Sequence, residues 1–323
     1  FTTERIPARD GYSDHLIARA PWNDGRPGIL VMSHLDTVHP KGTLESFPFS
    51  IDGDGAFGPG IYDMKGGAHI AYRAIIAGAV PLSVTHLFTT DEEVGSPTSR
   101  DLIRKMGSEA KYVLVTEPAR EGGKVVTARK GVARWTIKAI GRPAHAGSRH
   151  ADGRNAIAEI ARQVVRLTDM TDYERDITVN VGLIEGGTGA NVVPAECWTR
   201  IDCRLPAMAA AEEMTARISG LSPFDPDIRL ELTGGLDRPP YEKSEAIESL
   251  FQHAKRLAAE IGWTLEDLKT GGCSDGNFTA ADTPTLDGLG VDGKGGHTLE
   301  EQLYISSLSP RCRLMRRLLE TLD

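Results

Sequence analysis

Residues 28–40 read GILVMSHLDTVHP, a short apolar run that ends abruptly in a histidine and an aspartate. The run predicts a strand in a sheet that is covered on both faces, with the polar residues at the end of the strand. Side chains two apart on extended backbone point the same way, so His34 and Asp36 share a face. A metal-bound imidazole usually donates its other N–H to a carboxylate. His34 is therefore a candidate metal ligand with Asp36 as its partner, although a structural His–Asp pair would look the same.

The composition is that of an ordinary globular chain. With 323 residues, of which 40% are hydrophobic and 25% charged, the length favours two domains. The net charge of −8 gives no reason to expect nucleic acid or an anionic membrane as a partner. No apolar stretch approaches the roughly 18–20 residues of a membrane span. Four cysteines do not make a disulfide framework, so free thiols are expected.

The sequence enters a strand-like pattern at once and does not begin with a signal peptide. We therefore expect residues upstream of Phe1. A cytoplasmic location is the default expectation, and a periplasmic one is the alternative, because a targeting segment further upstream would not be visible.

Strands and helices alternate from residue 28 to about residue 128. Further strands are predicted over 82–90 and 111–116, and helices over 64–79 and 97–106. This alternation favours an α/β sheet with helices on both faces, in which ligands bind at the carboxyl ends of the strands.

Acidic residues follow these strands. Glu92 and Glu93 come after the second strand, Glu117 comes after the third, and Asp63 closes a glycine-rich loop. Each alone would be an ordinary solvated loop acid. Together at one sheet edge they would repel one another unless a cation lay between them.

The middle of the chain has a different pattern. Strands over 132–140, 177–184, 195–205 and 227–233 and helices over 152–168 and 208–219 give the order βαββαβ. This order is that of a ferredoxin-like α+β domain, and we expect an exposed edge of its antiparallel sheet, or its helical face, to serve as a dimer surface. The α/β pattern resumes near residue 237, with helices over 244–261 and 305–322, a strand over 263–269 and a short apolar stretch over 284–286. This segment would complete the first sheet. We expect a discontinuous α/β domain, residues 1–130 and 237–323, interrupted by an inserted domain, residues 131–236.

The ordered motifs carry a family resemblance along nearly the whole chain. They are SHLDTV, GPGIYDMKGG, TTDEEVGS, VTEP, GRPAHAG, GGTGANVVP, IDCRLP, TGGCSDGNF and GGHT. The set resembles the di-zinc exopeptidases and deacylases that include glutamate carboxypeptidase, succinyl-diaminopimelate desuccinylase, acetylornithine deacetylase and aminoacylase, and is most similar to the glutamate carboxypeptidase branch. The resemblance implies a zinc-exopeptidase-like catalytic domain, an inserted lid and dimerisation domain, and a homodimer.

The resemblance also implies a centre of two Zn²⁺ ions. Its ligands would be His34 and Glu117 for one ion, Glu93 and His297 for the other, and Asp63 between them. Nitrogen and oxygen ligands suit Zn²⁺, while Co²⁺ or Mn²⁺ would fit similar ligands. Glu92 would be the general base that activates a metal-bridging water and then protonates the leaving nitrogen. The residues alone do not decide which of the two adjacent glutamates is the base.

Further residues are assigned to the substrate by the same resemblance. His145 would stabilise the oxyanion in the active site of the other subunit. Asn191 and Arg238 match positions that line the substrate carboxylate site, where a guanidinium can bind bidentately. Gly272 would touch the same end of the substrate. Arg204 is either a further substrate residue or an arginine of structural or interface function.

The expected function is a zinc-dependent hydrolase of amide bonds in N-acyl or N-peptidyl amino acids with a free carboxylate, acting as a carboxypeptidase. The alternative is an N-acyl-amino-acid deacylase or desuccinylase with the same site. A silent binding module would have lost Glu92 or a ligand, and none is lost. A nucleophilic hydrolase using Cys273 or Ser274 would be insensitive to chelators.

Overall fold

The computed structural model describes residues 1–323, which fold as two compact units. Unit 1 consists of Phe1–Arg129 and Tyr241–Asp323, and unit 2 consists of Lys130–Pro240. Unit 2 is thus inserted into the chain of unit 1. None of the helices has both the length and the apolarity that crossing a bilayer requires.

A six-stranded sheet organises unit 1. Its strands, in spatial order, are β1 (Thr2–Ile6), β2 (His15–Arg19), β6 (Val84–Thr89), β3 (Ile29–His34), β7 (Tyr112–Val115) and β16 (Thr285–Leu286). The strands β6, β3, β7 and β16 run parallel to one another, whereas β2 pairs antiparallel with both β1 and β6. The carboxyl ends of β6, β3 and β7 therefore lie side by side at one edge of the sheet.

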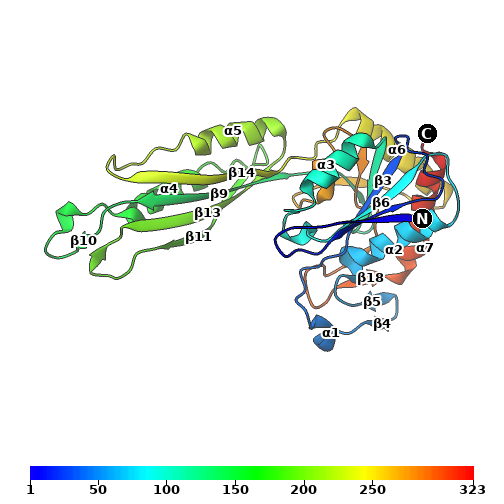
Figure 1. The fold of residues 1–323 in the computed structure, drawn as a ribbon, viewed down its shortest axis with the longest axis horizontal. Helices are drawn as coiled ribbons and strands as arrows, with labels where there is room; N and C mark the ends of the chain where they lie inside the picture. Colours follow the sequence, from blue (N-terminus) through cyan, green and yellow to red (C-terminus); the bar gives the residue numbers. More distant parts are fainter. The chain divides into compact units, whose positions relative to one another are not determined.

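Strand β3 is buried along its whole length, as its unbroken apolar run predicted. Ile29 and Val31 pack into a core that includes residues of α2 (Gly66–Ile76), α6 (Glu245–Glu260) and α7 (Ile305–Thr321). Leu30 and Met32 point the other way, into a core with Ile103 of α3 (Arg100–Glu109). The helices of unit 1 are α1 (Thr43–Ser46), α2 (Gly66–Ile76), α3 (Arg100–Glu109), α6 (Glu245–Glu260) and α7 (Ile305–Thr321). The expected α/β sheet with helices on both faces is confirmed (Figure 1).

Helix α2 begins later than the sequence pattern predicted. Ile61–Lys65 form an irregular turn in which Asp63 has non-helical backbone angles, and the helix proper starts at Gly66. A Cβ atom on Gly67 would lie 2.0 Å from the carbonyl oxygen of Thr116. Only glycine lets the start of α2 approach the end of β7 this closely.

Two small sheets of unit 1 escaped prediction because most of their strands are too short to show periodicity. One has the order β17 (Gly293–Lys294), β18 (Gln302–Tyr304), β5 (Gly55–Phe57) and β4 (Ser50–Asp52). In the other, β15 (Asp267–Thr270) pairs in parallel with β8 (Val125–Arg129). The expectation that the segment after residue 237 completes the main sheet is confirmed by β16, while the predicted strand over 263–269 becomes β15 of this small sheet.

Unit 2 has the predicted βαββαβ order. Its elements are β9 (Gly131–Ile140), α4 (Ala156–Thr168), β11 (Thr178–Gly186), β13 (Glu196–Leu205), α5 (Met208–Ser219) and β14 (Arg229–Arg238). The sheet is antiparallel throughout, in the order β11-β13-β9-β14, and α4 and α5 contribute to its core (Figure 1). Cys197 and Cys203 alternate into that core as free thiols. A short ladder joins β10 (Ala144–His145) to β12 (Val192–Val193).

Candidate metal centre

Two imidazoles and four carboxylates are carried to one edge of the main sheet of unit 1. They are His34 at the end of β3, Glu92 and Glu93 in the turn after β6, Glu117 after β7, Asp63 in the turn before α2, and His297 between β17 and β18. The Nε2 atom of His34 lies 3.1 Å from Oδ1 of Asp63. The Nε2 atom of His297 lies 3.4 Å from Oδ2 of the same carboxylate. The two oxygens of Asp63 thus face two different imidazoles, as a bridging ligand requires.

Each of the two imidazoles also has a glutamate beside it. Oε1 of Glu117 lies 3.7 Å from Nε2 of His34. Oε2 of Glu93 lies 3.3 Å from Nε2 of His297. The geometry therefore brings together the pairs His34–Glu117 and Glu93–His297, with Asp63 between them.

The ring of His34 is held in one orientation by the chain that follows it. Its Nδ1 atom lies 3.0 Å from the backbone oxygen of Asp36 and 3.6 Å from the carboxylate oxygen Oδ1. Nδ1–H therefore donates to the carbonyl, which leaves Nε2 facing Asp63 and Glu117, where it can bind either a proton or a cation. We expected the carboxylate of Asp36 to accept from His34, but its backbone carbonyl does so. Oδ2 of the Asp36 carboxylate instead accepts the backbone N–H of Glu93, at 2.9 Å.

The carboxylates of the cluster repel one another, and burial disfavours their charged forms. Burial raises the pKa of Glu117 well above its usual range, and burial with the charge of Asp63 raises the pKa of Glu93. Burial opposes protonation of His34, but the hydrogen bond to Asp63 and the charge of Glu117 raise its pKa well above normal. The hydrogen bond to Asp63 also raises the pKa of His297. A bound cation would compete with protons for these atoms, so its affinity should fall as the pH falls.

One buried oxygen supports a cation at this place. Oε1 of Glu93 has no hydrogen-bond partner, although buried carboxylate oxygens rarely lack one. The available donors are imidazole nitrogens and carboxylate oxygens, the ligand types that Zn²⁺ takes with three or four protein atoms. The residues present fit a pair of divalent cations.

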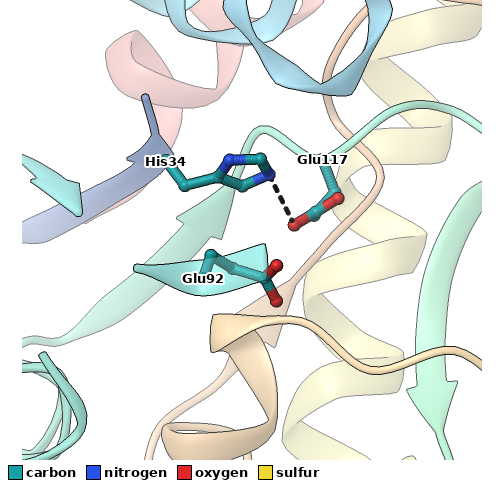
Figure 2. Close-up of side chains that lie close together, drawn as sticks. All are labelled: His34, Glu92 and Glu117. Atoms are coloured by element: carbon teal, nitrogen blue, oxygen red, sulfur yellow. Dashed lines mark ion pairs between the residues drawn. The ribbon is translucent and has the colours of Figure 1, made fainter. Parts of the chain in front are cut away.

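Glu92 belongs to the same cluster. The donor atoms of His34, Glu92 and Glu117 lie within 4.8 Å of one another, and so do those of His34, Asp63 and Glu93. Figure 2 shows the carboxylates of Glu92 and Glu117 on the same side of the His34 ring. Glu92 is therefore placed to act on a substrate or water held among these groups.

The loop that carries Gly272 is fixed by an arginine that the sequence reasoning did not single out. Arg129, at the end of β8, is fully buried and donates from Nε to Asp287, at 2.7 Å. One of its terminal nitrogens donates to the carbonyl of Gly272, at 3.2 Å, and to that of Cys273, at 3.5 Å. Nothing in the local pattern marks Arg129 as buried, because its partners are more than 140 residues away along the chain.

In unit 2, the β10–β12 ladder brings His145 and Asn191 together. The backbone N–H of Ala146 donates to the carbonyl of Asn191, at 2.9 Å, and both His145 and Asn191 are exposed. Nδ1 of His145 accepts the backbone N–H groups of Gly147 and Ser148, each at 3.1 Å. A neutral His145 must therefore carry its proton on Nε2, where it can donate to a ligand oxygen.

The two arginines assigned to the substrate also lie in unit 2. Arg204 donates to Asp202, at 2.6 Å, and Arg134 donates to the same carboxylate, at 3.3 Å. This network favours the structural alternative for Arg204. Arg238 is the last residue of β14 and only 4% exposed. Contact with a substrate would require its guanidinium to become accessible.

Similar proteins are known at the level of both sequence and structure. The sequence pattern of peptidase family M20/M25/M40 matches residues 30–321. Carboxypeptidase G2 from Pseudomonas sp. (strain RS-16) is 32% identical over 324 residues, which cover 95% of this chain and 76% of that protein. Succinyl-diaminopimelate desuccinylase from Bordetella avium is 29% identical over 349 residues, which cover 98% of this chain and 90% of that protein.

Two solved structures match nearly the whole chain. Aminopeptidase PepT from Bacillus cereus has a TM-score of 0.75 at 23% identity, covering 98% of this chain and 88% of that one. The M20 family metallo-carboxypeptidase Sso-CP2 from Sulfolobus solfataricus has a TM-score of 0.72 at 15% identity, covering 98% and 89%. Both share the α/β fold with its separate antiparallel sheet.

Proposed function

Because this chain belongs to peptidase family M20/M25/M40, as its motifs predicted, we propose that it hydrolyses the amide bond of N-acyl or N-peptidyl amino acids with a free α-carboxylate. The chain is a metallopeptidase-like hydrolase of that family. The observation that carries the proposal is the position of Asp63, whose two oxygens face His34 and His297. Two Zn²⁺ ions are the proposed occupants, with Co²⁺ or Mn²⁺ as substitutes.

The proposed ligands are His34 and Glu117 on one side, Glu93 and His297 on the other, and Asp63 between them. When bound, the two cations would polarise the scissile carbonyl and make a water molecule more acidic. Glu92 would accept the proton of the attacking water and then deliver it to the leaving nitrogen. Asp36 would keep the ligand set in place through its carbonyl on His34 and its carboxylate on the amide of Glu93.

Unit 2 is proposed to supply lid and substrate contacts. The Nε2–H of His145 would donate to the oxyanion, because Nδ1 already accepts two backbone N–H groups. Asn191 and Arg238 would bind the substrate carboxylate, and Gly272 would line the same end. Arg204 is proposed to hold the sheet together through Asp202.

The homodimer is proposed to form along strand β11. This strand is at the edge of the unit 2 sheet, and Leu183 and Ile184 on it are 53% and 54% exposed. An edge with free backbone groups and apolar side chains is a ready surface for pairing with a second chain. Replacing both residues with lysine should convert a dimer into a monomer in light scattering; a wild-type monomer would refute the assignment.

The alternative activity is that of an N-acyl-amino-acid deacylase or desuccinylase. The 29% identity to a succinyl-diaminopimelate desuccinylase over 98% of the chain supports it. Both activities would use the same metal centre and differ in which side of the amide the enzyme selects.

A substrate panel distinguishes them. N-acetyl, N-succinyl, N-benzoyl and N-glycyl groups are each paired with Glu, Asp, Leu, Arg and ornithine, and hydrolysis by the zinc-loaded enzyme is measured with and without chelator. Chelator-sensitive release of one preferred amino acid from several acyl partners supports the carboxypeptidase. Activity confined to one small acyl group supports the deacylase, and no chelator-sensitive hydrolysis contradicts both.

A further inference from the structure

Glu301, a buried acidic residue of the hairpin that carries His297, lies behind the metal centre and contacts the turn that presents Asp63. Glu301 is 1% exposed, and its carboxylate accepts backbone N–H groups from the turn before α2. Oε1 accepts from Tyr62, at 3.0 Å, and from Asp63, at 2.9 Å, while Oε2 accepts from Gly60, at 2.9 Å. One carboxylate thus binds three backbone amides of the segment that presents Asp63.

The fourth partner of Glu301 comes from a different loop. His39 approaches Oε2 of Glu301 with its Nε2 atom, at 2.7 Å, and its side chain is only 7% exposed. His39 lies in the loop that follows β3 and His34. Glu301 lies immediately before β18 and four residues after His297. The carboxylate therefore joins the three segments that carry His34, Asp63 and His297.

The turn held by Glu301 requires glycine at position 60. Gly60 has a φ angle of +70°, and a Cβ atom there would lie 2.3 Å from both Cγ2 of Thr37 and Nζ of Lys65. The segment needs glycine for its backbone conformation and for the close approach of the Thr37 loop. Glu301 supplies the acceptors for three backbone amides of this segment.

We propose that Glu301, with His39 as its hydrogen-bond donor, is the positioning residue that sets the distance between Asp63 and the two ligand histidines. This inference rests on the proposed metal centre. Neither residue contacts the cations or the substrate in this role. Partners behind the ligands of a metal site fix ligand orientation, and their loss typically lowers metal affinity or activity about 10–100-fold.

The test compares the substitutions Glu301→Gln and Glu300→Gln in the full-length protein. Glutamine keeps the shape of the side chain but places an NH₂ group against N–H donors on one side. Glu300 is the adjacent, exposed glutamate and serves as the matched control. Zinc affinity is measured by competition with a chromophoric chelator, and the visible absorption spectrum is recorded with CoCl₂. We expect Glu301→Gln to bind zinc about 10–100-fold more weakly and to alter the cobalt spectrum, with Glu300→Gln matching the wild type.

A parallel pair of variants covers the case in which Glu301→Gln does not fold. His39→Gln keeps an N–H donor for Glu301, whereas His39→Leu removes it. Weaker zinc binding in His39→Leu and recovery in His39→Gln, at equal thermal stability of the metal-free proteins, support the positioning role. Wild-type zinc affinity and cobalt spectrum in folded Glu301→Gln, or in His39→Leu if that variant must carry the test, overturn it. Failure of the wild type to bind either cation would instead refute the proposed metal centre.

Discussion

Replacing Arg129 with methionine should destabilise unit 1 severely, because the substitution leaves Asp287 as a buried carboxylate without its countercharge. Both side chains are 0% exposed and their ion pair measures 2.7 Å. Removing one partner of such a pair typically costs about 3–5 kcal/mol. The net stability of a domain is only about 5–15 kcal/mol, so the variant should lose a large part of it. For a protein of this size, the loss corresponds to a fall in Tm of about 6–20 °C.

The same substitution should loosen the candidate site. Arg129 donates to the carbonyls of Gly272 and Cys273, and its charge lowers the pKa of Glu117 against the raising effect of burial. Without the guanidinium, Glu117 should bind protons more tightly and zinc more weakly. The measurement is zinc affinity at constant pH, with the metal-free and metal-loaded Tm recorded on the same samples.

A double-mutant cycle isolates the ion pair. Asp287→Asn removes the carboxylate charge, keeps one acceptor oxygen for the backbone N–H of Gly288, and places an NH₂ group against the Ser274 hydroxyl, which can accept from it. The variant Arg129→Met/Asp287→Asn should therefore be more stable in urea unfolding than Arg129→Met alone, with a coupling energy of about 0.5–3 kcal/mol. A loss below about 1 kcal/mol in Arg129→Met, or no coupling in the cycle, would show that the buried pair does not matter as argued.

Three further outcomes are expected. Burial lowers the pKa of His86 to about 3, below its unfolded value of about 6.5, so the stability it contributes at neutral pH is lost progressively as the pH falls through this window. Between pH 7 and pH 5 that loss is about 2 kcal/mol, and it should be absent when urea unfolding is repeated with His86→Gln. Glu92→Gln should retain both metals in elemental analysis and lose turnover by about 10²–10⁴-fold; loss of one metal would mean that Glu92 and Glu93 exchange roles. His145→Ala should lower kcat by about 10²–10³-fold at unchanged metal content, and a loss of zinc would reveal a structural role instead.

The parts of the site that follow from sheet geometry could be predicted from the sequence. His34 and Glu117 follow directly from buried strands, and the ends of adjacent parallel strands must meet. The alternation on β13 and the βαββαβ order of unit 2 were likewise predictable, because side-chain periodicity reports which face is buried. The resemblance to a known family supplied the assignment of Asp63 and His297, which come from loops.

The rest depends on contacts that no local pattern records. Glu301 reaches the amide of Gly60 across 241 residues of sequence, and the motif around it has no hydrophobic periodicity. The strands of the β17-β18-β5-β4 sheet are two or three residues long, so alternation cannot reveal them. The carbonyl of Asp36, rather than its carboxylate, orients His34, since backbone direction after a strand end is set by the tertiary fold.

The most direct test of the metal centre is anomalous diffraction at the zinc absorption edge from crystals of the zinc-loaded protein. We expect two peaks about 3.5–4 Å apart, one between His34 and Glu117 and the other between Glu93 and His297, with Asp63 in contact with both. A single peak, or peaks bound by other side chains, would contradict the two-metal centre.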